Sequence, residues 1–470
     1  MNDIAGKGGT ERSAWQELGE SGRLLQFILL CLGVWLHAAD TLVTATIMPA
    51  VVEDIGGVAY VNWTISLYQI GSILAGTATG ALSRRLGLRR TLIAAAAVYA
   101  LGCVANALTP DMATMLTARL VQGFGGGAMV SISYVAIELL FPERLWTRLM
   151  AIVAMIWGVA ALCGPLIGGL FAHAGLWRGL FWTFAAQALL LGLAAGAFLD
   201  DGARNRPEPR RWPWSPLVLL AAATLLIAEA GAVARPALSV PLGVAGLVLL
   251  YAAARADRRA ENRLLPGQLL EIGSPVGAGL LMVFMLSAAT TAFWAYGPLI
   301  LQIAFAIDPL ISGYLMAAEA LAWSACTMLV AGARASQETR VIGIGVAIIA
   351  LSGIGFTIAM PMGALPGILV SMLLQGAGFG LAWPFIVRRI VLLAPSDERG
   401  LAASAAPTVQ RIGYAVGAAA AGIAANAVGV GDGATVASAH DAAFWVFASF
   451  LPLFAIGGLA ALRFTAAAAR

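Results

Sequence analysis

Four ionisable side chains stand inside long apolar stretches of this 470-residue sequence, namely Asp40, Arg119, Glu319 and Arg411. An ionised group in hydrocarbon costs at least about 2.5 kcal/mol, so such residues usually face a partner charge or a water-filled cavity. Buried carboxylates can accept and release protons, and buried groups of either sign can form ion pairs or bind charged ligands. These four residues are therefore the first candidates for chemistry.

The composition places most of the chain in a lipid bilayer. Hydrophobic residues make up 60% of it, charged residues only 11%, and the mean hydropathy is +0.87. Soluble domains carry about 25% charged residues, so these values exclude a soluble enzyme, a disordered chain and a disulfide scaffold. The four cysteines lie in apolar runs and are expected to be small core residues. No His/Cys cluster has the spacing of a zinc site, so neither a metal nor a cofactor is expected.

Fourteen apolar runs between residues 24 and 464 are each long enough for a membrane helix, which needs about 20 residues. If the N-terminus is cytoplasmic, the inner segments carry 24 of the 28 basic residues, whereas the outer loops carry only Arg178 and Arg235. Such a bias sets the orientation of membrane proteins. It predicts an all-α membrane protein with both termini in the cytoplasm. It also explains the net charge of +4 better than binding to nucleic acid does.

An internal repeat divides the chain into two halves. Leu-Val-Gln-Gly-Phe-Gly-Gly at 120–126 recurs as Leu-Leu-Gln-Gly-Ala-Gly-Phe at 373–379, and the Glu-Arg pair at 143–144 recurs at 398–399. The first pair of segments falls on the fourth and twelfth runs, so the halves repeat at eight helices. Two six-helix bundles with two inserted helices explain this spacing, and chance similarity of glycine-rich helices is the alternative. Parallel repeats of this kind place a ligand site near the midplane, between the bundles.

The runs and the repeat together predict the organisation of the chain. We expect a cytoplasmic N-terminal segment (1–22) without a cleaved signal peptide, an N-terminal six-helix bundle (23–199), a cytoplasmic linker (200–214), two inserted helices (215–256), a cytoplasmic loop (257–272), a C-terminal six-helix bundle (273–464) and a tail (465–470).

Four local patterns can be given a structural role. The loop after the second run, residues 80–90, reads Gly-Ala-Leu-Ser-Arg-Arg-Leu-Gly-Leu-Arg-Arg, in which Gly80 and Gly87 permit a tight turn and Arg85 and Arg89 hold the inner face. The fourth run contains Arg119-x-x-Gln122-Gly123. The fifth run contains Gly158, Gly164, Pro165, Gly168 and Gly169, small residues that allow close helix packing and a proline that bends the helix. The first run contains Asp40-Thr41.

With these patterns, the sequence resembles the major facilitator superfamily, and within it the fourteen-helix drug:proton antiporters. The resemblance covers nearly the whole chain. It implies a secondary transporter in the cell's inner membrane that works by alternating access, functions as a monomer, and exports hydrophobic, cationic drugs or toxic compounds in exchange for protons. Arg84 stands where the family has aspartate, which puts the family's inner-gate ion pairing in doubt.

Two other readings remain open. One keeps the fold but changes the cargo to a specific metabolite, a siderophore or a lipid. The other is a membrane-embedded enzyme, for which His37 near Asp40 is the only candidate group.

Depth along the helices suggests which charges meet. At about 1.5 Å per residue, Asp40 lies about 8 Å and Arg119 about 10 Å below the outer surface, so an ion pair is the cheapest arrangement for both. We expect Asp40 to be ionised beside Arg119 in one state and protonated in the other, which couples proton entry to rocking of the bundles. A static structural pair is the alternative.

Glu319 lies about 15 Å deep, near the midplane. It is expected to take part in proton coupling and to bind a lipophilic cation with the aromatic residues Trp294, Tyr296 and Trp323. Arg411 lies at a similar depth, where it either pairs with Glu319 or recognises an anionic group of the substrate. Further candidates to line the substrate cavity are Gln69, Gln122, Trp157 and Gln375.

Overall fold

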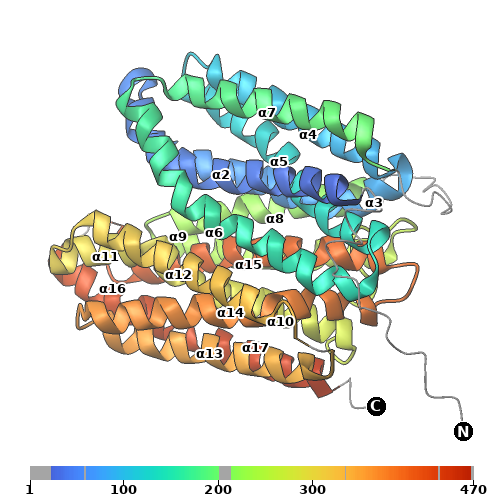
Figure 1. Ribbon diagram of the computed structural model, residues 1–470. Helices are drawn as coiled ribbons and strands as arrows, with labels where there is room; N and C mark the ends of the chain where they lie inside the picture. Colours follow the sequence, from blue (N-terminus) through green and yellow to red (C-terminus); the bar gives the residue numbers. More distant parts are fainter. Residues whose placement is uncertain (1–22, 58–59, 201–212, 334, 432–434, 467–470) are drawn as a thin grey trace, which may run out of the picture.

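The computed structural model describes residues 23–57, 60–200, 213–333, 335–431 and 435–466, and within these ranges every regular element is a helix (Figure 1). The expected N-terminal segment 1–22 lies outside the described residues. So do most of the linker 200–214 and the last four residues of the tail.

The helices fall into three groups along the chain. The first comprises α2 (Arg23–Ile55), α3 (Val61–Leu86), α4 (Leu88–Ala107), α5 (Met112–Leu140), α6 (Glu143–His173) and α7 (Trp177–Phe198). The second is the pair α8 (Trp214–Ala232) and α9 (Pro236–Arg259). The third comprises α10 (Pro275–Ala289), α11 (Thr291–Phe305), α12 (Pro309–Val330), α13 (Glu338–Ala359), α14 (Leu365–Leu393), α15 (Arg399–Ala427), α16 (Val436–Ala448) and α17 (Leu451–Ala466), with a short 3-10 helix at Ala335–Gln337.

Local sequence explains several of the helix ends. Asp111 begins α5, because its carboxylate accepts a hydrogen bond from the backbone N–H of Thr114 at 2.8 Å. Ser274 does the same for α10 through Gly277, with Pro275 in the first helical position. Gly87 has a φ of 84°, a conformation that favours glycine, and so lets α3 turn into α4 within one residue.

Glycines let α5 pack closely at the centre of the first bundle. A Cβ on Gly123 would collide with the backbone carbonyl of Tyr68 in α3, and one on Gly125 would collide with the backbone of Tyr99 in α4. Small residues are what permit helix backbones to approach this closely in a membrane. The same sequence feature therefore fixes the positions of α3 and α4 relative to α5.

The second bundle repeats this packing around α14. A Cβ on Gly376 would collide with the backbone of Glu319 in α12, and one on Gly378 would meet the backbone of Gly345 and Ile349 in α13. Gly376 and Gly378 are the repeat partners of Gly123 and Gly125 in the sequence. The two copies of the repeated segment thus occupy the same place in their bundles, which supports a true repeat over chance similarity.

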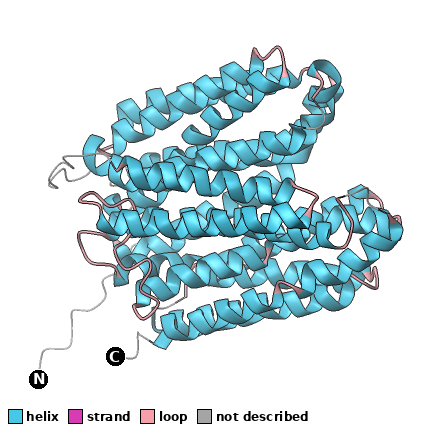
Figure 2. Ribbon diagram, turned by 180° about the vertical axis from the view of Figure 1, so that it is seen from behind, coloured by secondary structure: helices cyan, strands magenta, loops and turns pink. Residues whose placement is uncertain are grey.

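The two bundles meet along a few helix pairs. Helix α6 contacts α12, while α3 and α5 contact α15. The inserted helices pack on each other, and α8 also contacts α3 and α15, so this pair lies beside the seam and touches both bundles. Seen from behind, the long helices run in roughly one direction with short connections at the two ends (Figure 2).

Twelve segments of the described chain are long and apolar enough to cross a membrane by length and composition, with α10–α11 and α16–α17 each counted as one. Two other long helices are more polar: α3 with 26 residues and α15 with 29. A helix of that length spans more than 30 Å at about 1.5 Å per residue. The structure thus shows twelve candidate spans. The remaining two of the fourteen apolar runs coincide with α3 and α15, and that these two also cross the membrane stays a prediction.

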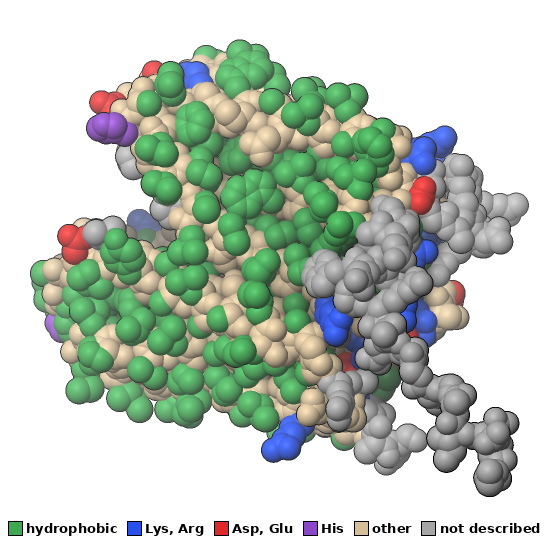
Figure 3. Space-filling model, in the orientation of Figure 1, with side chains coloured by type: hydrophobic (Ala, Val, Ile, Leu, Met, Phe, Trp, Pro, Cys, Tyr) green, Lys and Arg blue, Asp and Glu red, His purple; other side chains and the backbone are tan. Residues whose placement is uncertain are grey.

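Apolar side chains cover the middle of the visible face, and the charged ones gather at its two ends (Figure 3). We call the end that carries the α3–α4 turn, with Arg84, Arg85, Arg89 and Arg90, the basic end. A hollow separates the two bundles at the opposite end (Figure 3). Large apolar side chains such as Leu329, which is 80% exposed, face outward as expected for contact with lipid.

Candidate functional site

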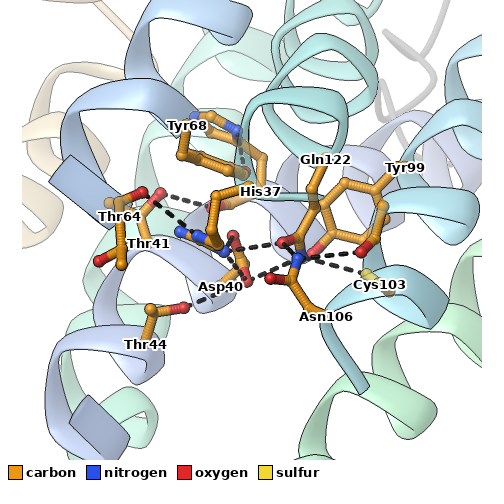
Figure 4. Close-up of polar contacts among 12 residues, drawn as sticks. His37, Asp40, Thr41, Thr44, Thr64, Tyr68, Tyr99, Cys103, Asn106 and Gln122 are labelled. Atoms are coloured by element: carbon orange, nitrogen blue, oxygen red, sulfur yellow. Dashed lines mark hydrogen bonds and ion pairs between the residues drawn. The ribbon is translucent and has the colours of Figure 1, made fainter. Parts of the chain in front are cut away.

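The centre of the first bundle holds a buried ion pair. Arg119 Nη1 on α5 donates to both carboxylate oxygens of Asp40 on α2, at 3.0 and 2.9 Å, and the two side chains are 1% and 0% exposed (Figure 4). The pairing expected from their depth is confirmed. Neither residue faces lipid, so each charge is compensated inside the protein.

Neutral polar side chains form further hydrogen bonds around this ion pair. Gln122, one turn after Arg119, donates to Asp40 Oδ1 at 3.0 Å and accepts from Arg119 Nη1 at 2.8 Å. Asn106 of α4 donates to the same Gln122 oxygen at 2.9 Å. Thr44 of α2 donates to Asp40 Oδ1 at 3.3 Å. Asn106 and Thr44 were not identified from the sequence, because a single amide or hydroxyl in an apolar run is usually a helix–helix contact.

A histidine and a tyrosine lie beside the pair. His37 Nδ1 is 2.7 Å from the Tyr68 hydroxyl, and the Arg119 guanidinium lies 4.3 Å from the centre of the Tyr68 ring. Trp157 of α6 packs edge-on against His37, with ring centres 5.6 Å apart. His37 Nε2 is buried without a hydrogen-bond partner in the described part of the chain. Trp157 therefore borders the Asp40 region, but it is not bonded to the carboxylate.

Glu319 in the second bundle is held by neutral donors. Gln375 Nε2 on α14 donates to its Oε1 at 2.9 Å, and Trp294 Nε1 on α11 donates to its Oε2 at 2.6 Å. Glu319 is 6% exposed, and among the described residues no Lys or Arg forms an ion pair with it. Its charge, unlike that of Asp40, is not compensated by a neighbouring cation.

The repeat extends to these carboxylates. Gln122 and Gln375 are equivalent positions of the repeated segment, and each donates a side-chain N–H to a buried carboxylate of its own bundle. The acids themselves are not equivalent, because Asp40 lies on the first helix of its bundle, whereas Glu319 occupies the place of Tyr68 against the repeat glycine. Sequence comparison of the halves could find the glutamines but not the acids they hold.

Arg411 does not pair with Glu319 in this structure. It lies on α15, 8% exposed, and its Nη1 atom is buried without a hydrogen-bond partner. The sequence left two roles open for Arg411, and the first of them, an ion pair with Glu319, is absent from this structure. The other predicted cavity residues are half-buried: Gln69, Tyr296 and Trp323. Trp323 stacks on Phe379 with ring centres 4.8 Å apart, so its ring is turned toward α14.

The segment 80–90, expected to be a loop, is helical except at Gly87, because α3 continues to Leu86 and α4 begins at Leu88. It is tied to other elements at the basic end. Gly80 faces α15, where a Cβ would lie 2.7 Å from Ser404 Oγ. Arg89 Nε donates to the carbonyl of Leu199 at the end of α7 at 2.6 Å, whereas Arg85 is exposed. Arg84 donates to the carbonyl of Arg263 at 3.1 Å. The arginine that replaces the family's aspartate thus binds the loop that follows the inserted helices.

The glycines of α6 face two different partners. A Cβ on Gly158 would collide with Ser324 of α12, across the seam between the bundles. Gly164 and Gly168 face α2, at Leu42 and Thr46, whereas Gly169 has nothing within 4 Å of its Cβ position. Gly158, Gly164 and Gly168 thus each allow a close helix contact, whereas Gly169 makes none with the described residues. The side chain of Pro165 lies outside the described part of the structure.

Ion pairs join the bundles at the basic end. Arg388 of α14 bridges Glu143 at the start of α6 and Glu338 at the start of α13, at 2.7 and 2.8 Å. Arg263 pairs with Glu398, which follows α14, at 2.8 Å. The sequence placed these residues at the inner face by charge, but it could not tell which of them would meet.

The sequence of this chain matches a known protein family. A family model described as Major Facilitator Superfamily matches residues 30–356. The chain belongs to the major facilitator superfamily. It is a multi-pass membrane transporter and not an enzyme, which excludes the reading built on His37.

Relatives of this transporter agree with that assignment. It is 31% identical over 474 aligned positions to a protein of Mycobacterium tuberculosis named "Probable multidrug-efflux transporter", and the match covers 97% of each chain. A shorter match, 25% identical over 167 positions and covering 36% of this chain and 37% of the relative, is to the multidrug efflux pump SdrM of Staphylococcus aureus.

Two solved structures share the fold. The proton:xylose symporter XylE has a TM-score of 0.66 at 18% identity, covering 94% of this chain and 95% of its own. The human organic anion transporter MFSD10 has a TM-score of 0.63 at 17% identity, covering 93% and 98%. At 17% and 18% identity, these two similarities support the major facilitator fold alone.

Proposed function

We propose that this transporter exports hydrophobic, cationic compounds from the cell in exchange for protons, as a fourteen-helix monomer of the inner membrane with both termini in the cytoplasm. The observation that carries the proposal is the pair of buried carboxylates, one in each bundle, held by equivalent glutamines. The relative named as a probable multidrug-efflux transporter supports drug-like cargo. The basic residues at one end support the orientation.

Asp40 is the proton-coupling group in this proposal. Ionised, it accepts four hydrogen bonds, two of them from Arg119. A proton that arrives on the carboxylate removes its negative charge, and with it the coulombic attraction of the ion pair that strengthens the two bonds from the guanidinium. Arg119 is then free to take other partners, and the change of partners biases the positions of α2 and α5.

Glu319 is the cation-binding group. A buried carboxylate with only neutral donors attracts either a proton or a cationic ligand, since an isolated charge is costly away from water. The Trp294 ring, 39% exposed, is fixed beside the carboxylate by its own N–H and can stack on a flat cation. Proton and cargo then compete for one carboxylate, which is a direct way to exchange one for the other.

The arrangement of the bundles supports an outward-facing state. At the basic end, Arg388 joins α14 to α6, and half-way along its length α6 meets α12 at Gly158. A hollow separates the bundles at the other end (Figure 3). With the basic end in the cytoplasm, the cargo path is closed on the inside and open on the outside, where a proton from outside can enter.

Transport in inside-out vesicles tests the proposal. We expect vesicles with an acidic interior to accumulate the lipophilic cation ethidium when they carry the native transporter, and to lose this accumulation when the pH gradient is collapsed. Asp40→Asn should abolish the accumulation, because the group can no longer change its charge, while exchange of ethidium down its own gradient is retained. Accumulation by the Asp40→Asn variant at the native rate contradicts proton coupling through Asp40.

A second cargo class keeps the fold and the mechanism: a metabolite, a siderophore or a lipid with an anionic group. Arg411 Nη1, which is buried without a hydrogen-bond partner among the described residues, favours such a cargo. Transport of a panel of uncharged, cationic and anionic compounds in the same vesicles separates these cargo classes.

A further inference from the structure

Arg411 carries a buried positive charge for which the described part of the chain offers no ion pair. The residue is 8% exposed, and Nη1 has no hydrogen-bond partner. Asp40, Arg119 and Glu319, the other three charged candidates in the interior, each have hydrogen-bond partners within the chain. A buried guanidinium N–H without an acceptor is costly, and most buried polar groups in proteins have a partner. The position therefore calls for an acceptor that the chain does not supply.

Other polar groups converge on the same place. A Cβ on Gly76 of α3 would lie 2.9 Å from Ser131 Oγ of α5, 3.0 Å from Thr408 Oγ1 of α15 and 3.7 Å from Arg411 Nη1. Ser131 Oγ is also buried without a partner. Two buried donors without a hydrogen-bond partner in the described part of the chain, a guanidinium N–H and a hydroxyl, thus face one spot on α3, which they can approach closely because Gly76 has no side chain.

This spot lies between the bundles, because α3 and α5 belong to the first and α15 to the second. Among the described residues, no carboxylate forms an ion pair with Arg411. Its positive charge therefore has no counter-charge in that part of the chain, and it lies where cargo passes in the proposed function.

We propose that Arg411 and Ser131, where they approach α3 beside Gly76, form a binding site for one anionic group, of which a carboxylate is the best fit. The Nη1 group of Arg411 can donate a charge-assisted hydrogen bond to a carboxylate, and the serine hydroxyl can donate a second hydrogen bond. The site is distinct from Glu319 and gives the transporter a second class of cargo, hydrophobic carboxylates. It rests on the proposed function only in taking the seam between the bundles as the cargo path, and binding at this site requires no proton gradient.

Equilibrium binding to the full-length transporter in lipid nanodiscs tests the site. The probes are radiolabelled 1-naphthoate and its uncharged analogue 1-naphthamide, which have nearly the same shape. We expect naphthoate to bind at least about tenfold more tightly than naphthamide, the loss typical of a missing charge-assisted hydrogen bond. Arg411→Gln should remove this preference, and Arg411→Lys should keep part of it because it keeps the charge.

Gly76→Ala provides an independent variant that leaves all charges in place. Its methyl group would crowd Ser131 and Thr408 at the proposed site, so naphthoate binding should weaken at least about tenfold. Two matched controls lie on α13: Gly343→Ala, where nothing lies within 4 Å of the added Cβ, and Arg340→Gln, which is exposed. Both should bind naphthoate like the native protein. Thermal unfolding of each variant identifies any that fails to fold.

Competition with chloride shows whether the site also binds small inorganic anions or only the carboxylate of a cargo molecule. If chloride displaces naphthoate and its effect is lost in Arg411→Gln, the site takes small inorganic anions as well. If chloride has no effect, the site is selective for the carboxylate of a cargo molecule. Either result supports an anion site.

Three results overturn the proposal: equal binding of naphthoate and naphthamide, native naphthoate binding by Arg411→Gln, or no binding of either anion, which means that water alone solvates Arg411. Failure of ethidium transport with intact Arg411-dependent binding would instead count against the proposed function.

Discussion

At the scale of single residues, the two buried carboxylates are stabilised in different ways. Asp40 has a full positive charge at hydrogen-bond distance, whereas Glu319 has only the N–H groups of Gln375 and Trp294. Removing a partner from a buried ion pair leaves an uncompensated charge and costs several kcal/mol, typically about 3–5. In the proposed mechanism, the Asp40 site therefore resists change until a proton arrives, whereas the Glu319 carboxylate is available to an incoming cation.

Replacing Glu319 by Gln tests this difference. The substitution keeps the shape and a hydrogen-bonding group but removes the charge that is proposed to attract cargo. We expect ethidium binding to weaken about 10- to 100-fold, the range of one charged hydrogen bond of about 1.5–3 kcal/mol. Equilibrium binding of ethidium to the purified transporter measures the change.

Glu229→Gln is the matched control for this variant. Glu229 is a half-buried glutamate on the inserted helix α8, away from the seam residues that hold Glu319. It should leave ethidium affinity unchanged. If the two variants behave alike, Glu319 is not the cation-binding group.

At the scale of helices, packing is governed by where glycines allow backbones to touch. Gly123 and Gly376 hold equivalent places on α5 and α14, each against a backbone carbonyl of a neighbouring helix. Gly376 lies against the backbone of Glu319 itself, so the helix that carries the proposed cation site is positioned by this contact. A glycine in an open position, such as Gly169, has no such role.

Gly376→Ala should lower thermal stability, because the added methyl group forces α12 and α14 apart. Overpacking of this kind costs about 1–3 kcal/mol or more. Gly169→Ala, with open space around the added methyl group, should be neutral or slightly stabilising, since alanine is favoured over glycine in helices by up to about 1 kcal/mol. Thermal unfolding in detergent compares them, and equal melting temperatures would count against the packing argument.

A further link between helices lies outside the membrane-spanning part. Arg178 at the start of α7 pairs with Asp54 at the end of α2, and its second nitrogen donates to the carbonyl of Thr109 in the α4–α5 turn at 3.0 Å. The hydrogen bond from Arg178 holds the pKa of Asp54 below its usual value. The pair ties three segments of the first bundle together at the end where the bundles separate.

The lowered pKa predicts a pH dependence. Because the folded-state pKa of Asp54 lies below its unfolded value, the pair contributes stability above about pH 4, and this contribution is lost as the pH falls through the lowered value. The effect is small and screened by salt, since the pair is exposed. Melting temperatures measured across acid pH at low salt should show a shallower decline for Asp54→Asn than for the native transporter, and an identical decline would contradict this role.

At the scale of the whole molecule, the contacts at the basic end hold the two bundles together. Arg388 is the only charged residue of the described chain seen to bridge both bundles through two carboxylates, Glu143 and Glu338. The loop that follows the inserted helices is held there as well, because Arg84 donates to the carbonyl of Arg263, and Arg263 pairs with Glu398. Because these groups lie between the bundles, they stabilise one state of a two-state equilibrium and not the other.

Arg388→Gln should shift that equilibrium toward the state that is closed at the opposite end. Spin labels at Leu176 and Met362, exposed positions of the first and second bundles at that end, report the separation. We expect the distance distribution between the labels to gain a shorter component. Arg340→Gln, an exposed arginine on α13, is the control and should leave the distribution unchanged. No change in either variant would show that Arg388 does not hold the bundles in this state.

Much of the architecture could be predicted from the sequence. The fourteen apolar runs coincide with the long helices, because the need to satisfy backbone hydrogen bonds in lipid leaves a chain of this composition little choice but helix. The repeat gave the equivalence of α5 and α14, and helix rise placed Asp40 and Arg119 at one depth.

Helix depth and the repeat could not predict how each helix is rotated about its own axis. Nor could they predict which of several side chains at a similar depth would contact each other. Arg411 and Glu319 were expected at a similar depth, yet Glu319 accepts from Gln375 and Trp294, while Arg411 Nη1 has no hydrogen-bond partner in the described part of the chain. The sequence by itself determined which groups lie in the membrane and at what height, because those follow from rise per residue and hydropathy. Only the tertiary structure decided which of them touch, because contact depends on side-chain direction and on the close approaches that glycines permit.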